Sequence, residues 1–228
     1  MRIAEIFYSI QGEGLLAGVP SVFVRTSGCN LRCRWCDTPY TSWQPEGEEQ
    51  SLPQILSQVE RYPASHVVIT GGEPLLAQEI EQLSARLVDS GRHVTIETAA
   101  TLYKPLRCSL VSLSPKLANS TPWEREKGRF AAMHEERRLN LAVIQSYVAN
   151  HPYQLKFVVE RDGDFDEIEE VLRKVEGVER TRVLVMAEGT APEVLRARAA
   201  WIVERCKAHG FRYTPRLHIE LYGNKRGA

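Results

Sequence analysis

The cysteines at positions 29, 33 and 36 are the residues of this chain whose types and spacing most directly predict chemistry. Three residues separate Cys29 from Cys33 and two separate Cys33 from Cys36, which is too tight for a disulfide framework and typical of metal ligands. Thiolates are the usual ligands of 4Fe–4S clusters, so three on one short loop would hold three irons and leave the fourth open. An open iron predicts a reaction at this loop rather than a purely structural role.

A zinc site is the alternative explanation of the same cysteines. Structural zinc normally has four protein ligands, and the two remaining cysteines, Cys108 and Cys206, lie far downstream without a partner at CxxC spacing. A distant cysteine or one of the six histidines could still complete such a site. In that case the chain would be a zinc-binding module instead of an enzyme.

A second polar motif, Gly71-Gly72-Glu73-Pro74, follows an apolar stretch that we expect to be a strand. Glycines allow a ligand to approach the main chain closely, and the Glu73 carboxylate could attract an ammonium group. An ordinary turn from strand to helix, with Pro74 at the first helical position, explains these residues equally well.

Three further strand ends carry candidate site residues. Glu97 could reach a hydroxyl group or a charge inside a site, or could pair with a surface cation. Ser114 and Lys116 offer a hydroxyl group and a cation to a carboxylate or a ribose, unless Lys116 is a solvated surface side chain. Gln154 and Lys156 share one face of a strand because side chains alternate, so both face either a ligand or solvent.

Short apolar runs alternate with amphipathic helical patterns along the chain, which predicts an α/β fold. We expect strands at residues 20–26, 66–70, 93–97, 109–113, 155–160, 182–186 and 216–221, and helices at residues 52–61, 76–90, 139–150, 165–175 and 192–209. This order predicts a mostly parallel sheet with helices outside, either doubly wound or curled into a partial barrel. The site would lie at the carboxyl ends of the strands. Residues 118–138 are polar and predict a loop, either a lid or a solvated connector.

Length and charge limit the function classes. A chain of 228 residues can bury roughly 70% of its unfolded surface in one domain, so we expect a single domain over residues 1–228. The 29 basic and 29 acidic residues balance, which provides no overall attraction to nucleic acid. The first 14 residues include Glu5 and Glu13 and have no sustained apolar core, so they predict neither a secretion signal nor a membrane span. We therefore expect a cytoplasmic protein without a membrane or nucleic-acid partner.

Together these residues resemble a known family. The three-cysteine pattern with Trp35 before its last cysteine, followed downstream by Gly-Gly-Glu-Pro, resembles that of radical S-adenosylmethionine enzymes. Within that superfamily nearly the whole chain is similar to the 7-carboxy-7-deazaguanine synthase family. The positions that carry this closer resemblance are residues 9–14, Arg25, Cys36, Asp37, Thr38, Thr70, Ser114, Pro115, Lys116, Gln154, Leu155, Lys156 and Phe157.

The resemblance implies a single radical S-adenosylmethionine domain with a partial, abridged TIM-like barrel. It implies that Cys29, Cys33 and Cys36 hold a 4Fe–4S cluster, whose electron cleaves S-adenosylmethionine into methionine and a 5′-deoxyadenosyl radical. The positions implied for S-adenosylmethionine are Trp35, Cys36, Asp37, Gly72, Glu73, Ser114, Pro115, Lys116, Gln154, Leu155, Lys156 and Phe157. Thr38 matches the family's Mg²⁺ ligand, an oxygen donor of the kind that this hard cation prefers.

The resemblance also implies a lyase that acts on 6-carboxy-5,6,7,8-tetrahydropterin in queuosine and 7-deazapurine biosynthesis. Ring contraction with loss of ammonia would yield 7-carboxy-7-deazaguanine, and return of the abstracted hydrogen would regenerate S-adenosylmethionine. The implied substrate positions are Ile10, Gln11, Gly12, Glu13, Arg25 and Thr70, with Glu97 as a catalytic candidate and either His218 or the chain end as a further contact. An external electron donor such as a flavodoxin or ferredoxin, and a homodimer, are implied as partners.

A radical S-adenosylmethionine activase is the alternative within enzymes. Such a protein abstracts hydrogen from a glycine of a partner protein and would share the cysteine motif and the Gly-Gly-Glu-Pro motif. It would have no need for the pterin-like set at Gln11, Arg25 and Thr38.

Overall fold

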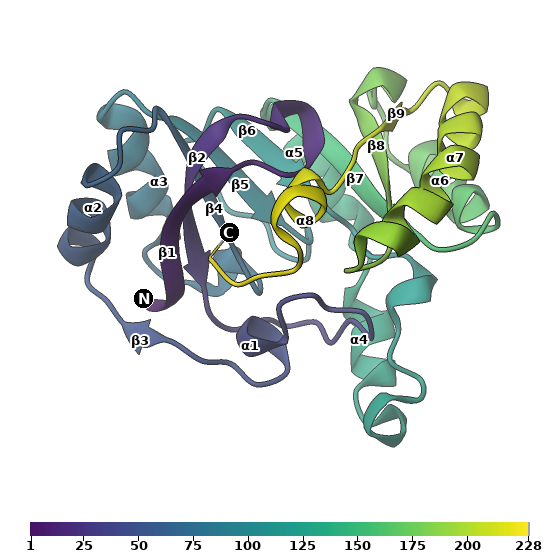
Figure 1. Cartoon of the computed structure of the whole chain (residues 1–228), viewed down its shortest axis with the longest axis horizontal. Helices are drawn as coiled ribbons and strands as arrows, with labels where there is room; N and C mark the ends of the chain where they lie inside the picture. The colour runs from purple at the N-terminus through teal and green to yellow at the C-terminus, as the bar shows by residue number, and fades with distance from the viewer. Residues whose placement is uncertain (228) are drawn as a thin grey trace.

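The computed structural model describes residues 1–227; residue 228, the last of the range expected for the single domain, lies outside the described residues. Strands and helices alternate along the described chain (Figure 1). The strands are β1 (Arg2–Ile10), β2 (Pro20–Thr26), β3 (Glu48–Glu49), β4 (His66–Gly71), β5 (His93–Thr98), β6 (Leu110–Leu113), β7 (Tyr153–Val159), β8 (Val183–Ala187) and β9 (Arg212–Tyr213). The helices are α1 (Pro39–Ser42), α2 (Leu52–Glu60), α3 (Ile80–Asp89), α4 (Ala131–Arg137), α5 (Leu141–Asn150), α6 (Asp164–Lys174), α7 (Pro192–His209) and α8 (Leu217–Tyr222).

Within residues 1–227 all nine strands join one sheet in the order β3-β1-β2-β4-β5-β6-β7-β8-β9. The strand β1 runs antiparallel to β2 and β3, and every other neighbouring pair is parallel. From β2 to β9 the order follows the chain without the reversal that defines a doubly wound sheet. The sheet therefore curls in one direction, which confirms the mostly parallel α/β fold and the partial barrel.

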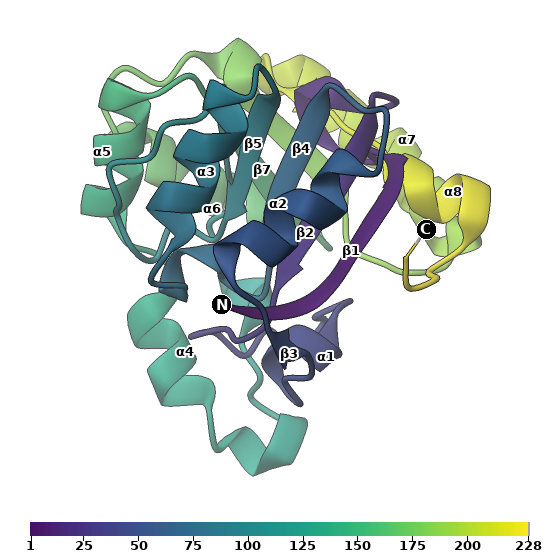
Figure 2. The ribbon, with the colours of Figure 1, turned by 90° about the vertical axis from the view of Figure 1, so that its left-hand side faces the viewer.

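The helices α2, α3, α5, α6 and α7 lie outside the curved sheet, and the main core fills the space between the two layers. Figure 2 shows α2 and α3 in front of the outer face of β4 and β5. Every residue of β7 and β8 is buried, as expected for parallel strands that are covered on both faces. In β7 the alternation separates two roles: Leu155 and Phe157 belong to the main apolar core, whereas Gln154 and Lys156 are buried polar residues.

The helix α7 begins and ends where the sequence predicts. Pro192 occupies the first turn, where its missing N–H leaves no helical hydrogen bond unmade. Gly210 follows the last residue in the left-handed conformation, with φ of 70°, which glycine adopts without steric cost. Pro192 and Gly210 therefore set the two ends of this helix.

The structure differs from the predicted secondary structure in several elements. The sequence predicts the last strand at residues 216–221, but residues 217–222 form the helix α8, and the last strand is β9. The apolar residues of this segment alternate as in a strand, yet Leu221 is 59% exposed. The strand β1 was not predicted, because its half-buried residues mix Arg2 and Glu5 with apolar side chains. The polar stretch 118–138 is not simply a loop, since it contains α4 and two short 3₁₀ helices.

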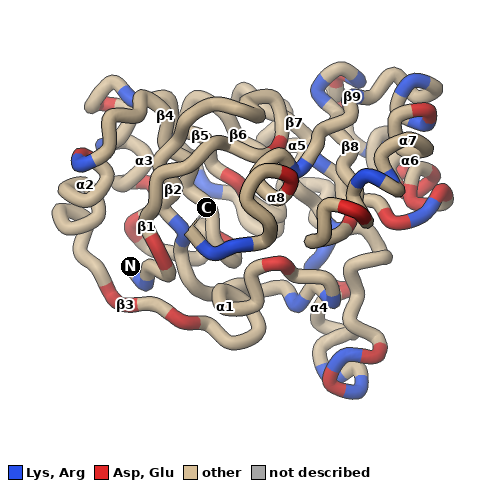
Figure 3. The backbone as a smooth tube through the Cα atoms, viewed as in Figure 1, with Lys and Arg blue, Asp and Glu red and all other residues tan. Residues whose placement is uncertain are grey.

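The segment around α4 projects away from the sheet beneath the loop that follows β2 (Figure 1). Its tip carries both acidic and basic residues, as Figure 3 shows, so it presents no surface of a single charge. Among residues 1–227, none of the helices combines the length and the apolar character that crossing a membrane requires.

Candidate active site

A cavity of about 380 Å³ lies at the carboxyl ends of the parallel strands. This volume falls within the usual range for small-molecule sites. The loop after β2, the turn after β1 and the segment that contains α8 all contribute lining residues. Most of the predicted residues line it: Ile10, Gln11, Gly12, Glu13, Arg25, Cys29, Cys33, Trp35, Cys36, Asp37, Thr38, Thr70, Gly72, Glu97, Ser114, Lys116, Lys156 and His218.

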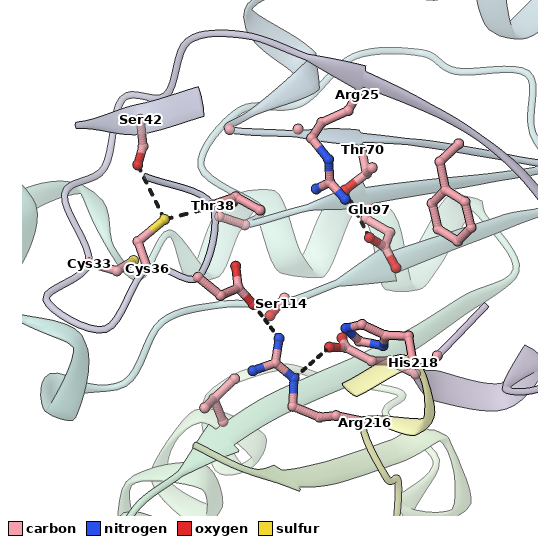
Figure 4. Close-up of a pocket in the computed structure, with 18 of the residues that line it drawn as sticks. Arg25, Cys33, Cys36, Thr38, Ser42, Thr70, Glu97, Ser114, Arg216 and His218 are labelled. Atoms are coloured by element: carbon pink, nitrogen blue, oxygen red, sulfur yellow. Dashed lines mark hydrogen bonds and ion pairs between the residues drawn. The ribbon is translucent and has the colours of Figure 1, made fainter. Parts of the chain in front are cut away.

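The cysteine loop forms one wall of the cavity. Cys29, Cys33 and Cys36 pack in a small apolar cluster with Leu31 and Ala99, and Figure 4 shows the thiols of Cys33 and Cys36 beside the cavity. Burial raises the pKa of the Cys29 thiol to about 12. Burial likewise raises the pKa of the Cys33 thiol. Such thiols suit ligation, because a bound metal replaces the proton that each would otherwise keep.

Two of the sulfur atoms have polar groups within hydrogen-bonding distance. The Leu31 N–H donates to Cys29 Sγ at 3.4 Å, and the Ser42 hydroxyl lies 3.2 Å from Cys36 Sγ (Figure 4). Hydrogen bonds to thiolate sulfur are one means by which proteins tune iron–sulfur clusters. The donor set and its surroundings therefore fit such a cluster.

The same thiols do not form a site for a single metal ion. Across residues 1–227, no three His, Cys, Asp or Glu side chains gather where they could hold one ion. Tetrahedral zinc with Zn–S bonds of about 2.3 Å would require sulfur atoms about 3.8 Å apart. In a 4Fe–4S cluster each thiolate binds a different iron, so the sulfur atoms stand farther apart.

His134 of α4 holds the cysteine loop from the outside. Its Nδ1 accepts a hydrogen bond from the Arg32 N–H at 3.0 Å, and its Nε2 lies 2.9 Å from the Ser120 hydroxyl. Burial lowers the pKa of His134 to about 4, so the ring is neutral near neutral pH and Nδ1 remains an acceptor. The projecting segment is thus tied to the loop that carries the cysteines.

A hydrogen-bonded group around Glu97 forms the wall opposite the cysteines (Figure 4). Glu97 Oε1 accepts from Gln11 Nε2 at 3.1 Å, and Oε2 accepts from the Thr70 hydroxyl at 2.9 Å. The Lys156 ammonium lies 3.9 Å from Oε1. These contacts bring together residues from β4, β5, β7 and the turn after β1, all predicted as site residues.

Arg25 faces the same part of the cavity. Its Nε donates to Glu5 Oε1 at 2.7 Å, and its guanidinium carbon lies 5.6 Å from the centroid of the Phe7 ring. Among the described residues its two terminal nitrogens donate no hydrogen bond, so that edge of the fork remains available for a ligand carboxylate.

Two half-buried carboxylates, Glu13 and Asp37, share a single guanidinium. Arg216 Nε donates to Glu13 Oε1 at 3.0 Å, and Arg216 Nη2 donates to Asp37 Oδ2. Burial alone would raise the pKa of Glu13, but Lys156 and Arg216 outweigh it and hold that pKa below its usual range. Burial likewise opposes ionisation of Asp37, and Arg216 again keeps its pKa low. Both carboxylates are therefore ionised in the folded protein.

His218 of α8 packs against Gly12. A Cβ atom on Gly12 would lie 1.8 Å from His218 Nδ1, so only glycine admits the ring at this distance. Burial lowers the pKa of His218, which leaves the ring neutral at neutral pH. Its Nδ1 is buried against Gly12 and has no hydrogen-bond partner among the described residues.

Five predicted residues do not line the cavity: Glu73, Pro115, Gln154, Leu155 and Phe157. The Glu73 carboxylate is buried and accepts hydrogen bonds from Leu75 N, Thr98 Oγ1 and Ala99 N, so it joins the ends of β4 and β5. Gln154 accepts from Leu15 N at 2.8 Å and thereby anchors the turn after β1. Leu155 and Phe157 lie in the main core and Pro115 is buried, so their side chains serve the fold.

Arg216 is the principal site residue that the sequence did not indicate. It was expected in a strand at residues 216–221, where alternation gives no reason to place its side chain beside Glu13 and Asp37. A charged residue directly before the Leu-His pair was the one available signal. The cavity also includes Phe7, Phe23 and Tyr40, whose aromatic side chains sequence reasoning passed over.

Known proteins resemble the chain over its full length. Residues 23–120 match the family model of the Radical SAM superfamily. The 7-carboxy-7-deazaguanine synthase of Rhodopirellula baltica is 46% identical over 228 residues, covering 100% of this chain and 88% of that protein. The 7-carboxy-7-deazaguanine synthase of Halobacterium salinarum is 45% identical over 234 residues, covering 98% of this chain and 91% of that protein.

Solved structures share the fold. The crystal structure of QueE from Escherichia coli aligns with a TM-score of 0.69 at 25% identity, covering 93% of this chain and 92% of that chain. SuiB from Streptococcus suis bound to the precursor peptide SuiA aligns with a TM-score of 0.57 at 14% identity, covering 88% of this chain and 54% of that chain. The second likeness concerns the fold alone.

We expect His134→Ala to lower the free energy of unfolding by about 1–3 kcal/mol at pH 7.5, because the Arg32 N–H loses its acceptor. The folded pKa of His134 is lowered from 6.5 to about 4, so its stabilising contribution is complete above pH 6.5 and declines as the pH falls toward 4. The difference between wild type and variant should therefore shrink at pH 5. Chemical denaturation at both pH values measures it, and equal differences would contradict this role.

We expect Gly12→Ala to lower the free energy of unfolding by about 1–3 kcal/mol, because the new methyl group overlaps the His218 ring. Removing the ring in Gly12→Ala/His218→Ala should restore part of the loss. Gly163→Ala is the matched control, since nothing lies within 4 Å of the added Cβ. Urea denaturation of the four proteins tests the contact, and a double variant no more stable than Gly12→Ala would refute it.

Proposed function

The chain belongs to the 7-carboxy-7-deazaguanine synthase family of radical S-adenosylmethionine enzymes, and on this premise we propose that it converts 6-carboxy-5,6,7,8-tetrahydropterin into 7-carboxy-7-deazaguanine and ammonia. The reaction balances without a net oxidant or reductant, since the product differs from the substrate only by the ammonia released. The observation that carries the proposal is one cavity whose opposite walls hold the three thiols and the polar set around Glu97 and Arg25.

We assign a 4Fe–4S cluster to Cys29, Cys33 and Cys36, and S-adenosylmethionine to the cavity beside them. When bound, these two groups supply the carbon radical that begins the reaction by removing hydrogen from the substrate. The residues that would hold S-adenosylmethionine are those of the predicted set that line the cavity: Trp35, Cys36, Asp37, Gly72, Ser114, Lys116 and Lys156. The Trp35 ring is held at the cavity wall by its Nε1–H, which donates to the Asn119 carbonyl at 3.1 Å.

The opposite wall has the chemistry to bind the pterin. The free edge of the Arg25 guanidinium suits the substrate carboxylate, because it can make two parallel hydrogen bonds. Gln11 and Glu97 offer an amide and a carboxylate to the donor and acceptor edge of the pyrimidine ring. Glu97 is kept in place by Thr70, and the neutral ring of His218 closes this side. The residues thus orient the substrate and exclude water.

Several finer assignments belong to this proposal. Thr38 lines the cavity and would supply an oxygen to Mg²⁺. We infer that a flavodoxin or ferredoxin delivers the electron, that the chain acts as a cytoplasmic homodimer and a single domain, and that the product serves queuosine or 7-deazapurine synthesis. The family relatives and the ligand-sized cavity support this function over an activase, whose partner is a protein segment.

The decisive experiment is anaerobic incubation of the reduced, iron-loaded protein with S-adenosylmethionine and the carboxy-tetrahydropterin, followed by mass analysis of the product. We expect 7-carboxy-7-deazaguanine from the wild type and none from Cys33→Ala, which should also lose the iron chromophore. Cys206 is buried in the core away from the cavity, so Cys206→Ser should retain iron and product. A wild type that carries iron but leaves the pterin unchanged would refute the proposal.

We expect Thr38→Ala to abolish the response of turnover to added Mg²⁺ while leaving the iron content unchanged. Thr38→Ser keeps the hydroxyl oxygen and should restore the response. The measurement is the initial rate as a function of Mg²⁺ concentration, with iron content by absorbance as the control. An identical Mg²⁺ response in wild type and Thr38→Ala would exclude Thr38 as the ligand.

A further inference from the structure

Arg216 is the most fully engaged cation of the cavity. Its side chain is only 6% exposed, and its guanidinium donates in three directions. Nε donates to Glu13 Oε1 at 3.0 Å, Nη1 donates to the Gly189 carbonyl at 2.6 Å, and Nη2 donates to Asp37 Oδ2. Figure 4 shows the side chain reaching into the cavity between two carboxylates.

The partners of Arg216 come from loops that are distant in the sequence. Glu13 lies in the turn after β1, Asp37 directly follows Cys36, and Gly189 follows β8. Arg216 itself precedes α8. One planar group therefore connects the cysteine loop with the turn that presents Gln11 and Gly12.

The charges around Arg216 make this connection difficult to replace. Among the described residues, Asp37 forms its ion pair with Arg216 alone, whereas Glu13 is shared with Lys156. Lys156 in turn lies 3.9 Å from Glu97, and His218 is neutral. If Asp37 moved toward a ligand, it would separate from its only ion-pair partner or would carry Arg216 and Glu13 with it.

We propose that Arg216 is a positioning residue that couples the binding of S-adenosylmethionine to the binding of the substrate. The inference rests on the proposed function, which places Asp37 at S-adenosylmethionine, and on the family resemblance, which implies that Glu13 lies at the substrate. A ligand that fixes the Asp37 carboxylate also fixes the Arg216 guanidinium. The guanidinium then holds the Glu13 carboxylate in the position from which it would contact the substrate. Coupling of this kind is reciprocal, so each ligand strengthens the binding of the other by the same factor.

The fork geometry explains why the residue is arginine. Guanidinium holds its donors in a rigid plane and can serve two carboxylates and a carbonyl at fixed angles. An ammonium group on a flexible stem keeps the charge but not this geometry. Arg216→Lys should therefore preserve the fold better than removal of the charge, and it should still release the two carboxylates from each other.

The test measures binding rather than turnover. Anaerobic titration calorimetry of the iron-loaded protein gives the dissociation constant of the carboxy-tetrahydropterin with and without saturating S-adenosylmethionine. We expect the cofactor to tighten substrate binding at least about fivefold in the wild type and less than about twofold in Arg216→Lys. In turnover assays the variant should also release more 5′-deoxyadenosine for each product molecule.

Arg198→Lys is the matched control. Arg198 also bridges two carboxylates and a carbonyl, with Nη1 at 2.5 Å from both Glu188 Oε2 and the Glu188 carbonyl and Nη2 at 3.8 Å from Glu160 Oε1. It lies on α7 and does not line the cavity. This variant should keep the wild-type coupling. If Arg216→Lys does not yield soluble protein, Asp37→Asn tests the same bridge and should weaken the effect of S-adenosylmethionine on substrate affinity.

Coupling that persists unchanged in Arg216→Lys or Asp37→Asn would overturn the inference, as would a wild type in which the two ligands bind independently. Equal loss of coupling in Arg198→Lys would also overturn it, because a general loss of stability would then explain the result. Failure of the proposed function is recognised separately, since the wild type would then form no 7-carboxy-7-deazaguanine.

Discussion

The compensation of buried charge is the constraint on which the site depends. Three carboxylates, Glu13, Asp37 and Glu97, lie at the carboxyl ends of the strands with the cations Lys156 and Arg216 between them. An isolated charge in such a place would be costly, so each ionised group requires a partner. Because the partners come from different loops, satisfying the charges also brings those loops together.

The open sheet makes this arrangement possible. Helices cover its outer face, and the buried apolar side chains of β7 and β8 stabilise that layer without any help from the cavity. The inner face can therefore carry polar groups such as Lys156, which a fully packed interior would exclude. His134 fastens the cysteine loop from outside the barrel. Glu73 and Gln154 fasten the neighbouring strand ends and turns. Rigid surroundings of this kind hold a ligand loop in one conformation.

Much of the site could be predicted because the spacing of ligand residues along the sequence indicates which chemistry they can perform. The spacing of Cys29, Cys33 and Cys36 indicated the ligand loop, and the resemblance of the polar motifs to one family indicated most of the residues around it. Where a predicted side chain does not line the cavity, the reason is packing. The side chains of Glu73 and Gln154 carry polar groups that suit a ligand, yet backbone N–H groups nearby take up their acceptors. Leu155 and Phe157 fall on the face of β7 that alternation turns toward the helices.

The sequence by itself determined most of the strands and helices from β2 to α7, the cysteine loop and the family, because hydrophobic periodicity, glycine and proline positions and ligand spacing are local properties. Only the tertiary structure decided that Arg216 joins Glu13 to Asp37, across 203 and 179 residues of chain respectively. Contacts of this range depend on how the sheet curls and on residues 217–222 forming a helix where a strand was expected. No local pattern encodes them, since the charges of the three residues are satisfied only after the distant loops have met.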